Sequence, residues 1–285
     1  MFIADLPYAK TLRDHLVRTV RFAIEEDLGS GDITAQLIPE DEQSTARVIT
    51  REEGILCGRE WFEEVFRQID PTLELNWLKQ DGDKILPNDA LVEIKGNTRA
   101  ILTAERTGLN FLQTLSGTAT LANRYATAVD GKDIIILDTR KTIPCLRLAQ
   151  KYATHVGGCQ NHRLGLYDMF LIKENHIAGC GGIENAVKRA KEIAPDKRIE
   201  VEVETIEQLQ EALNLPVDVI MLDNFDGQRT TEAVKLNANK IKLESSGNMD
   251  LDKIGEVISD HPDFVSVGKL TKHVTALDLS LRLVN

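Results

Sequence analysis

Charged and hydroxyl residues follow nearly every short apolar run in the second half of the chain. The apolar runs are IIIL (134–137), MFLI (169–172), RIEVEV (198–203), VDVIML (217–222), KIKL (240–243) and FVSV (264–267). The polar groups at or near their ends are DTRK (138–141), KENH (173–176), Glu202, Asp223, ESSG (244–247) and GK (268–269). In parallel βα barrels, the carboxyl ends of the strands form the active-site rim. Ordinary exposure of strand ends explains one or two polar positions but not the whole set, so we predict that these residues line one pocket.

The basic members of this set are candidates for binding a small anion. They are Arg140, Lys141, His162, Arg163 and Lys173. Arginine donates two parallel hydrogen bonds to a carboxylate or phosphate, and lysine acts as a mobile point charge. Such groups repel one another in an empty pocket, so we expect a ligand with several negative charges. The alternative is a surface salt-bridge network, which the apolar runs and the compact NHRLGL segment disfavour.

Glu202 and Asp223 are the acidic candidates. Strand alternation in RIEVEV places Ile199, Val201 and Val203 on one face and the glutamates on the other. A buried carboxylate is costly unless it meets a cation or a donor. Two carboxylates beside phosphate groups suit Mg²⁺, which keeps most of its water and takes few protein ligands. The pair could instead bind ribose hydroxyls, and both interpretations stay open.

A phosphate site is predicted near the last apolar runs. Ser246, Gly247 and Asn248 precede the helical segment MDLDKIGEVIS, and Gly268 follows FVSV. A glycine-bearing turn at a helix start presents free N–H groups and the positive end of the helix dipole. A simple helix cap explains the Ser-Gly-Asn segment equally well. The position late in the barrel favours phosphate, because loops after the last strands often take that role.

The elements that position these residues alternate between strand and helix, which predicts a parallel sheet. In IENAVKRAKEIA (183–194), for example, the apolar residues share one helix face. We favour a barrel with helices outside; the rival doubly wound sheet lacks a G-x-G-x-x-G motif after its first strand. The first third is mixed α and β, with strands at 45–57 and around Asp81-Gly82, and a helix at 60–68. The apolar periodicity of residues 103–128 predicts two consecutive helices with a break near Ser116-Gly117, and we expect them to link two domains.

Composition excludes several classes of protein. The chain has 285 residues and a formal charge of -11, which disfavours a nucleic-acid surface. No apolar run is long enough to span a bilayer, and the first residues do not resemble a signal peptide. The four cysteines form no CxxC pair or metal-binding spacing, so we expect reduced thiols in a cytoplasmic protein.

With these residues in place, the sequence resembles the quinolinate phosphoribosyltransferases. The similar segments are EDLGSGDIT (26–34), AERTGLNFLQTLSGTAT (104–120), LDTRKTIPCLR (137–147), GGCQNHRLGLYDMFLIKENHI (157–177), VEVE (201–204), IMLDNF (220–225) and SVGKLTKH (266–273). The resemblance implies an α/β fold in which an N-terminal α/β sandwich precedes an open parallel α/β barrel, the type II phosphoribosyltransferase-like architecture. We expect the sandwich at 1–115, joined by the C-terminal tail 272–285, and the barrel at 116–271.

The resemblance also implies an activity, the transfer of phosphoribose from phosphoribosyl diphosphate to quinolinate with decarboxylation. Quinolinate would be bound by Arg106, Thr139, Arg140, His162, Arg163 and Lys173, with Arg106 supplied by the partner in a homodimer with shared active sites, or in a higher oligomer. Phosphoribosyl diphosphate would be bound by Lys141, Glu202, Asp223, Ser246, Gly247, Asn248 and Gly268. Glu202 and Asp223 would hold Mg²⁺. The candidate catalytic residues are Lys141, Lys173, Glu202 and Asp223. No nucleic acid or membrane partner is implied.

Two departures from the family pattern concern the loops. Cys159 stands where the family often has a third glycine, and Ser246-Gly247-Asn248 stands in a segment that is usually EASGG. Asparagine tolerates left-handed backbone angles better than most residues, so the second loop can keep its shape. Three alternative functions remain: a nicotinate phosphoribosyltransferase, a molybdenum-associated relative of the same fold, and a non-catalytic protein that binds a phosphorylated metabolite.

Overall fold

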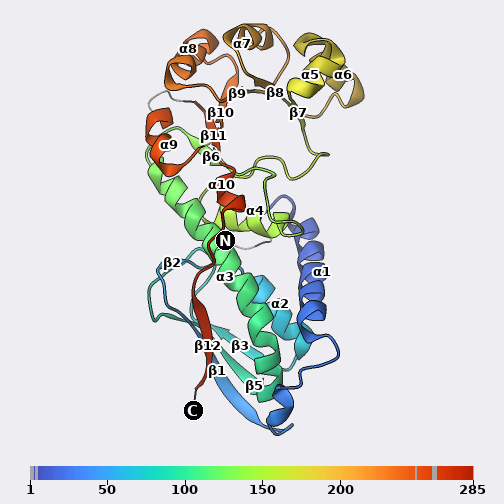
Figure 1. The fold of residues 1–285 in the computed structure, drawn as a ribbon, viewed down its shortest axis with the longest axis vertical. Helices are drawn as coiled ribbons and strands as arrows, with labels where there is room; N and C mark the ends of the chain where they lie inside the picture. Colours follow the sequence, from blue (N-terminus) through green and yellow to red (C-terminus); the bar gives the residue numbers. More distant parts are fainter. Residues whose placement is uncertain (1–2, 4–5, 248, 259–261, 285) are drawn as a thin grey trace. The chain divides into compact units, whose positions relative to one another are not determined.

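A computed structural model describes residues 3, 6–247, 249–258 and 262–284. The chain forms two compact units, residues 1–123, 143–158 and 273–285 in the first and residues 124–142 and 159–272 in the second. Each unit has its own sheet and its own core. Figure 1 shows the order of the elements along the chain.

The first unit is built on a four-stranded antiparallel sheet of order β12-β1-β5-β3. Its strands are β1 (Gln43–Thr50), β3 (Glu74–Trp77), β5 (Ala90–Asn97) and β12 (Leu279–Val284). A separate two-stranded ladder joins β2 (Gly54–Ile55) to β4 (Lys84–Ile85). β12 pairs with β1 along its own full length, from Val284 opposite Thr45 to Leu279 opposite Thr50.

Four helices accompany this sheet, and their apolar faces form the core of the first unit. They are α1 (Ala9–Leu28), α2 (Arg59–Ile69), α3 (Thr98–Ala128) and α4 (Arg147–Val156), with a short 3₁₀ turn at Ala35–Leu37. The helix predicted over 60–68 is confirmed as α2. The aromatic residues Trp61, Phe62 and Phe66 of α2 are fully buried, and Phe62 stacks on Phe66 at 4.5 Å between ring centroids. Aromatic side chains of this size contribute much of the apolar area that a core buries.

The predicted break near Ser116-Gly117 is wrong, because α3 runs without interruption from Thr98 to Ala128. The polar and small residues at this point have long-range partners instead. Ser116 donates to the Cys57 carbonyl and accepts from the Cys57 N–H, at 3.1 and 3.0 Å. Gly117 allows the backbone at Thr275 and Ala276 to pass against the helix. Residues that resemble a helix break in sequence are thus packing positions.

Gly117→Ala is expected to lower the free energy of unfolding by about 1–3 kcal/mol, the usual cost of overpacking a core. A Cβ at this position would lie 2.9 Å from the Thr275 carbonyl carbon and closer still to its oxygen. Backbone atoms cannot rotate away as a flexible side chain can. Urea denaturation of the two proteins measures the difference.

Gly179→Ala is the matched control for that measurement. Gly179 lies in the helix α5 (Glu174–Cys180), and a Cβ there meets nothing within 4 Å. Alanine in an open helical position is expected to be neutral or to stabilise by up to about 1 kcal/mol. A Gly117→Ala protein as stable as the Gly179→Ala protein would contradict the packing described for α3.

The second unit is built on a six-stranded parallel sheet of order β6-β11-β10-β9-β8-β7. The strands are β6 (Ile135–Leu137), β7 (Phe170–Ile172), β8 (Ile199–Val203), β9 (Val219–Asp223), β10 (Lys242–Ser246) and β11 (Phe264–Ser266). The helices are α5, α6 (Ile183–Ile193), α7 (Ile206–Ala212), α8 (Gly227–Asn237), α9 (Leu251–Ile258) and α10 (Lys269–Lys272). α6, α7 and α8 follow one another along β7, β8 and β9 (Figure 1).

The strand order distinguishes between the two predicted architectures. From β7 to β11 each strand pairs with the next in the chain, and β6 pairs with β11. A doubly wound sheet instead reverses direction at a switch point. The described order is that of a ring opened between β6 and β7, and no ladder joins those two strands in the part of the chain that the structure describes. The α/β fold with a parallel sheet is confirmed, and closure into a barrel stays a prediction.

Strand β10 begins and ends later than the apolar run KIKL (240–243) suggested. It spans Lys242–Ser246, because Glu244 and Ser245 pair with Phe264 and Val265 of β11. Glu244 and Ser245 are both 1% exposed. The polar residues ESS are therefore part of a central strand, and pairing on both sides rather than hydrophobicity sets its limits.

None of the helices in the described ranges is long and apolar enough to cross a membrane. The cysteines Cys57, Cys145, Cys159 and Cys180 are all free thiols. Cys57 and Cys159 are buried, and burial raises the pKa of both thiols. Neither thiol is therefore activated as a nucleophile.

Candidate active site

The second unit contains a pocket of about 600 Å³ at the carboxyl ends of its parallel strands. Its lining comes from segments that follow or end all six strands of the sheet. The predicted site residues that line it are Thr139, Arg140, Lys141, His162, Arg163, Lys173, Glu202, Asp223, Ser246, Gly247 and Gly268. The strand ends named in the sequence thus meet at one cavity, as expected for residues at one edge of a parallel sheet.

Two predicted site residues are not part of this pocket. Arg106 is exposed on α3 in the first unit, where it lines a different cavity of about 350 Å³ together with Asp27 and Asp32. Asn248 lies outside the described residues. The role of Arg106 in a partner subunit's site stays a prediction.

Arg140 and Lys141 lie in the loop that follows β6. The hydroxyl of Thr139 accepts a hydrogen bond from the Lys141 N–H at 3.1 Å, and Thr271 donates to the Lys141 carbonyl at 2.8 Å. The Nε of Arg140 is buried and has no hydrogen-bond partner among the described residues. An unpartnered buried donor is costly, so this edge of the pocket is suited to an acceptor.

Gly268 leaves room for the Lys141 side chain. A Cβ at Gly268 would lie 3.0 Å from the Lys141 Cδ and 3.7 Å from the Thr139 Oγ1. Lys141 therefore passes directly over a glycine, where most other residues would crowd it. The loops after β6 and β11 meet at this point.

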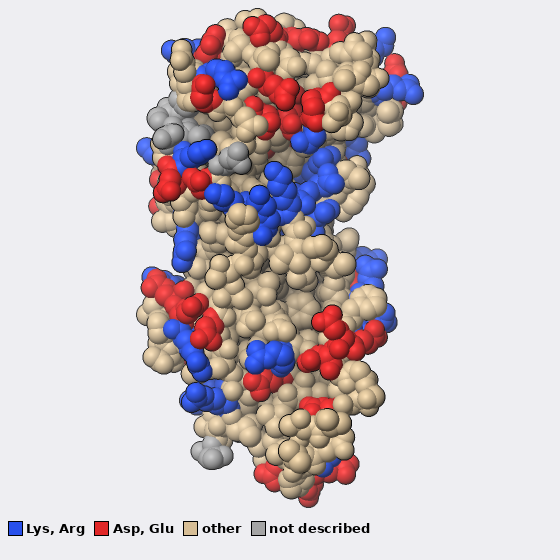
Figure 2. All heavy atoms as spheres, viewed as in Figure 1, with Lys and Arg blue, Asp and Glu red and all other residues tan. Residues whose placement is uncertain are grey.

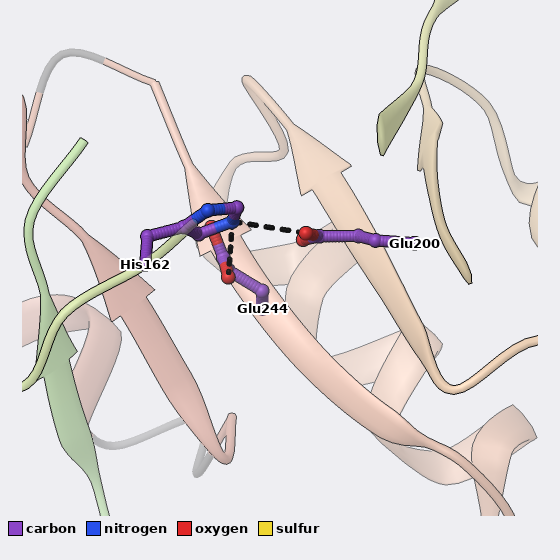
Figure 3. A group of neighbouring side chains, drawn as sticks. All are labelled: His162, Glu200 and Glu244. Atoms are coloured by element: carbon purple, nitrogen blue, oxygen red, sulfur yellow. Dashed lines mark ion pairs between the residues drawn. The ribbon is translucent and has the colours of Figure 1, made fainter. Parts of the chain in front are cut away.

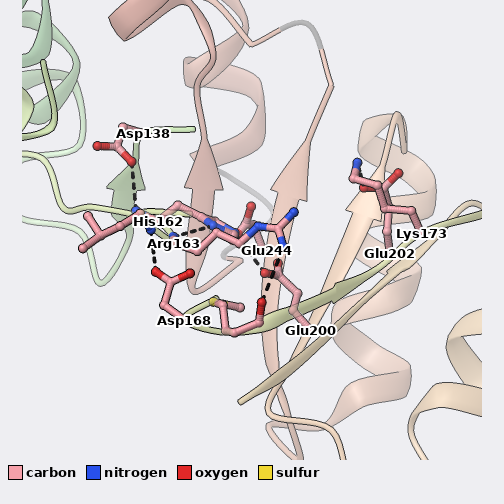
Figure 4. A network of polar contacts seen from close by, with 10 residues as sticks. Asp138, His162, Arg163, Asp168, Lys173, Glu200, Glu202 and Glu244 are labelled. Carbon is pink, nitrogen blue, oxygen red and sulfur yellow. Dashed lines mark hydrogen bonds and ion pairs between the residues drawn. The ribbon is translucent and has the colours of Figure 1, made fainter. Parts of the chain in front are cut away.

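Arg163 is held by a loop that two buried or half-buried aspartates brace. Asp138, fully buried, accepts from the His162 N–H at 3.0 Å and from the Asn161 side chain at 2.7 Å. Asp168 accepts from the Leu164 N–H at 2.5 Å. Figure 4 shows both aspartates beside the loop and the Arg163 side chain extending towards the glutamates. The loop is therefore fixed on either side of Arg163.

Burial lowers the pKa of Arg163, and the neighbouring Arg140 lowers it further. Arginine stays charged in proteins, so the lowered pKa reports a site where positive charge is concentrated and poorly solvated. Binding an anion would relieve both effects. This is the electrostatic behaviour that we expected from the basic residues of the sequence.

His162, Glu200 and Glu244 form a buried cluster below this loop (Figure 3). The imidazole Nε2 lies 2.9 Å from a Glu200 carboxyl oxygen and 3.6 Å from a Glu244 oxygen. Burial raises the pKa of Glu200 to about 7, and burial together with the adjacent Glu200 raises the pKa of Glu244 to about 8. Glu200 and Glu244 together therefore hold a proton near neutral pH, because two ionised carboxylates that face the same imidazole nitrogen repel each other.

Lys173 and Glu202 form the ion pair on the opposite side of the pocket. Lys173 follows β7 and Glu202 lies in β8, and their Nζ and Oε2 atoms are 2.6 Å apart (Figure 4). Asp223, at the end of the neighbouring strand β9, accepts from the Asn224 side chain at 2.7 Å. The acidic pair predicted from the sequence thus occupies adjacent strands, with a cation from the basic set beside it.

The turn after β10 begins at a glycine with a left-handed backbone conformation. Gly247 has a φ of 110°, which only glycine adopts readily, and a Cβ there would collide with the Asn224 side chain. The Asn224 N–H donates to the Ser246 carbonyl at 3.0 Å. The loops after β9 and β10 therefore pack together, and glycine is required at their contact.

Several lining residues had no binding or catalytic role assigned from the sequence, although Glu244 and Lys269 belong to the strand-end groups expected at the pocket. Lys269 and Lys272 of α10 line the pocket, and Lys269 pairs with Asp250 at 3.2 Å. Their spacing of three residues on one helix could have indicated them. Asn224 and Glu244 also line the pocket, next to predicted residues. Lys and Arg side chains gather in a band on the face shown in Figure 2, beside a group of Asp and Glu side chains, although the whole chain has a net charge of -11.

The chain matches two family models that together cover most of its length. The models are the quinolinate phosphoribosyl transferase N-terminal domain over residues 32–116 and the C-terminal domain over residues 118–282. The chain belongs to the quinolinate phosphoribosyltransferase family. Curated relatives agree with this assignment. A probable nicotinate-nucleotide pyrophosphorylase [carboxylating] of Bacillus subtilis is 40% identical, with 90% of this chain and 89% of the relative covered.

Other quinolinate phosphoribosyltransferase relatives are similar over comparable lengths. A chloroplastic nicotinate-nucleotide pyrophosphorylase [carboxylating] of Arabidopsis thaliana is 37% identical over 94% of this chain and 82% of the relative. The solved structure of the nicotinate-nucleotide pyrophosphorylase from Francisella tularensis has a TM-score of 0.94 and 47% identity, with 100% of this chain and 99% of that chain covered. The family resemblance inferred from the strand-end motifs is therefore confirmed.

Proposed function

We propose that this chain transfers phosphoribose from 5-phosphoribosyl 1-diphosphate to quinolinate, giving nicotinate mononucleotide, CO₂ and diphosphate in NAD biosynthesis. The observation that carries the proposal is that one strand-end pocket is lined both by basic residues and by carboxylates. Arg140 and Arg163 form its basic side, and Glu202 and Asp223 form its acidic side, with Lys173 paired to Glu202. A two-substrate reaction between a dicarboxylate and a phosphorylated sugar needs both. The relatives named for this reaction support the same conclusion.

Quinolinate is proposed to bind on the basic side of the pocket. Arg140, Arg163 and Lys173 supply the positive charge for its two carboxylates, and Thr139 and His162 line the same region. The orphaned Arg140 Nε and the lowered pKa of Arg163 support anion binding here. A nicotinate-specific enzyme would need to neutralise one carboxylate rather than two.

Phosphoribosyl diphosphate is proposed to bind across the acidic side and the glycine turns. Lys141 would pair with the diphosphate, and Ser246, Gly247 and Gly268 would surround the 5′-phosphate. Asn248 is part of the same proposal from sequence alone. A backbone with positive φ at Gly247 and a helix that follows are features of anion-binding loops.

Glu202 and Asp223 are suited to hold Mg²⁺ with the sugar diphosphate. They are two carboxylates on adjacent strands that line one pocket. Mg²⁺ takes such a small donor set when water and substrate oxygens complete its six positions. When bound, Mg²⁺ would neutralise charge on the diphosphate leaving group. Lys173, 2.6 Å from Glu202, links this region to the quinolinate side.

The residues then act mainly by positioning and by electrostatics. The basic side would orient quinolinate so that its ring nitrogen faces C1 of the ribose, where the N–C bond forms as the bond to diphosphate breaks. Lys141 would stabilise the negative charge that develops on the leaving group. The pyridinium ring so formed accepts the electron pair of the C2–carboxylate bond, CO₂ leaves, and C2 takes a proton. No covalent enzyme intermediate is required.

We further propose that the enzyme is a homodimer, or a higher oligomer, in which Arg106 reaches the quinolinate site of the partner subunit. Arg106 is exposed and carries a charge suited to a carboxylate. The free cysteines agree with a cytoplasmic location. Sedimentation of the Arg106→Ala protein shows whether the dimer persists, and its KM for quinolinate shows whether a substrate contact is lost. A raised KM in an intact dimer indicates a lost contact.

The decisive experiment supplies the chain with phosphoribosyl diphosphate, Mg²⁺ and either quinolinate or nicotinate, and measures nicotinate mononucleotide, CO₂ and diphosphate. We expect all three products from quinolinate in equal amounts and little reaction with nicotinate. Turnover of nicotinate without CO₂ would establish the sister reaction instead. Binding of phosphorylated ligands with no release of diphosphate would indicate a non-catalytic binding protein or the molybdenum-associated relative.

A further inference from the structure

His162 is held at both ring nitrogens by groups of the protein. Its Nδ1 accepts a hydrogen bond from the Arg163 N–H at 2.7 Å. Its Nε2 lies 2.9 Å from the Glu200 carboxyl and 3.6 Å from the Glu244 carboxyl (Figure 3). The His162 side chain is 8% exposed, and both glutamate side chains are 1% exposed.

The bond at Nδ1 determines which nitrogen carries the proton. A neutral imidazole has one donor and one acceptor nitrogen, whereas a protonated imidazole has two donors. Because Nδ1 accepts from the Arg163 N–H, the nitrogen that carries the ring proton is Nε2. That N–H points to Glu200, so the carboxyl oxygen is its acceptor.

The same three side chains have the donor types of a metal site, since their ligand atoms lie within 4.8 Å of one another. A metal ion needs the lone pair of a histidine nitrogen. At His162 the Nδ1 lone pair is occupied by the Arg163 N–H and the Nε2 position is a donor. The hydrogen bonds therefore favour a proton-linked cluster over a metal-binding cluster.

Stability does not account for the two glutamates. One oxygen of each, Oε1, is buried without a hydrogen-bond partner among the described residues. Buried carboxyl oxygens without donors cost free energy, and apolar residues in place of buried ionic groups often stabilise a protein. Both glutamates lie on central strands below the loop that carries Arg163. Their location instead favours a role in holding that loop.

We propose that Glu200 and Glu244 are positioning residues that act through His162 to direct Arg163 into the quinolinate site. The proposal rests on the proposed function, because it concerns the binding of that substrate. Glu200 fixes the ring, the ring accepts the Arg163 N–H, and Asp138 accepts the His162 N–H at 3.0 Å. Buried carboxyl groups therefore hold two consecutive backbone N–H groups: Asp138 binds that of His162 directly, and Glu200 holds that of Arg163 through the imidazole ring.

The kinetic test compares Glu200→Leu with Glu200→Gln. Leucine removes the acceptor, and we expect the KM for quinolinate to rise by roughly 10- to 100-fold through misplacement of Arg163, while the KM for phosphoribosyl diphosphate is unchanged. Glutamine keeps an acceptor oxygen and is expected to restore the KM for quinolinate. Glu244→Leu should act in the same direction but less strongly, because its oxygen is farther from the ring.

Glu204→Leu is the control for the leucine variants, since Glu204 is exposed directly after β8 and its KM values should match wild type. Because Glu200→Leu leaves the buried His162 N–H without its acceptor, its melting temperature is expected to fall somewhat, and the kinetics are measured well below it. An unchanged KM for quinolinate in Glu200→Leu, or an equal rise in both KM values, overturns the proposal.

A second measurement does not depend on enzymatic activity. Long-range ¹H–¹⁵N correlation spectra of the full chain labelled with ¹⁵N-histidine report which nitrogen of each ring is protonated, and His162→Asn identifies the His162 signals. We expect a proton on Nε2 in the wild-type protein and a changed pattern in Glu200→Leu. A proton on Nδ1 in the wild type overturns the proposal even if quinolinate is the substrate. If the spectra show the proton on Nε2 but the protein does not turn over quinolinate, the proposed function is contradicted. The hydrogen bonding of His162 would still be established in that case.

Discussion

Arg163→Ala is expected to lower kcat/KM for quinolinate by roughly 100-fold or more. Arg163 lies in a braced loop, lines the pocket, and has a pKa lowered by burial and by Arg140. A hydrogen bond to a charged group contributes about 1.5–3 kcal/mol, and an arginine can donate two to one carboxylate. Because about 1.4 kcal/mol corresponds to a factor of ten, the loss of such a pair is large. Steady-state kinetics with quinolinate varied at saturating phosphoribosyl diphosphate measure the effect.

Arg189→Ala provides the matched control, and Arg163→Lys tests the geometry. Arg189 is exposed on α6 and pairs with Glu192 at 3.0 Å, so the same substitution there should leave the kinetics unchanged. Lysine at position 163 keeps the charge but not the two parallel donors, and we expect it to recover only part of the loss. If Arg163→Ala and Arg140→Ala both retain wild-type kinetics, neither residue binds quinolinate.

Asp81→Ala is expected to lower the free energy of unfolding by about 3–5 kcal/mol, the cost of removing one partner from a buried charged network. Asp81 accepts from the Gly58 and Arg59 N–H groups at 3.1 and 3.2 Å, and from the Tyr152 hydroxyl at 2.7 Å. The two N–H groups belong to the start of α2, where a negative charge also meets the positive end of the helix dipole. Alanine leaves all of these donors without an acceptor.

Tyr152→Phe tests a smaller change in the same hydrogen-bond network. It removes one of the three donors but leaves Asp81 bonded to the backbone, so we expect a smaller loss of about 1 kcal/mol. Asp14→Ala, at an exposed position of α1, controls for the substitution itself and should have little effect. Equal stability of Asp81→Ala and Asp14→Ala in urea denaturation would mean that the network does not stabilise the first unit.

The residues at the carboxyl ends of strands were the most predictable part of the site. Hydrophobic runs identify buried parallel strands, and their ends in one sheet must share an edge, so Arg140, Lys173 and Asp223 can be grouped from the sequence alone. The structure places them around one pocket. The boundary of β10 was less predictable, because pairing with β9 and β11 extends it through polar residues.

Long-range contacts account for what the sequence did not reveal. Strand alternation places Glu200, Glu202 and Glu204 on one face, yet Glu200 is 1% exposed, Glu202 pairs with Lys173, and Glu204 is exposed. Their different surroundings come from other strands and loops, not from their own strand. In α3, Ser116 resembles a break until its partner Cys57 is known, and that partner lies 59 residues earlier.

Strand β12 bears on how the protein folds during its synthesis. It pairs with β1, and nearby Asp278 bonds to Glu52 across 226 residues of chain. The whole second unit is encoded between these strands. The ribosome must therefore synthesise that unit before the first sheet can be completed, and until then β1 has an unpaired edge of the kind that promotes aggregation. Chaperones that shield exposed strand edges would therefore act on the first unit until β12 is synthesised.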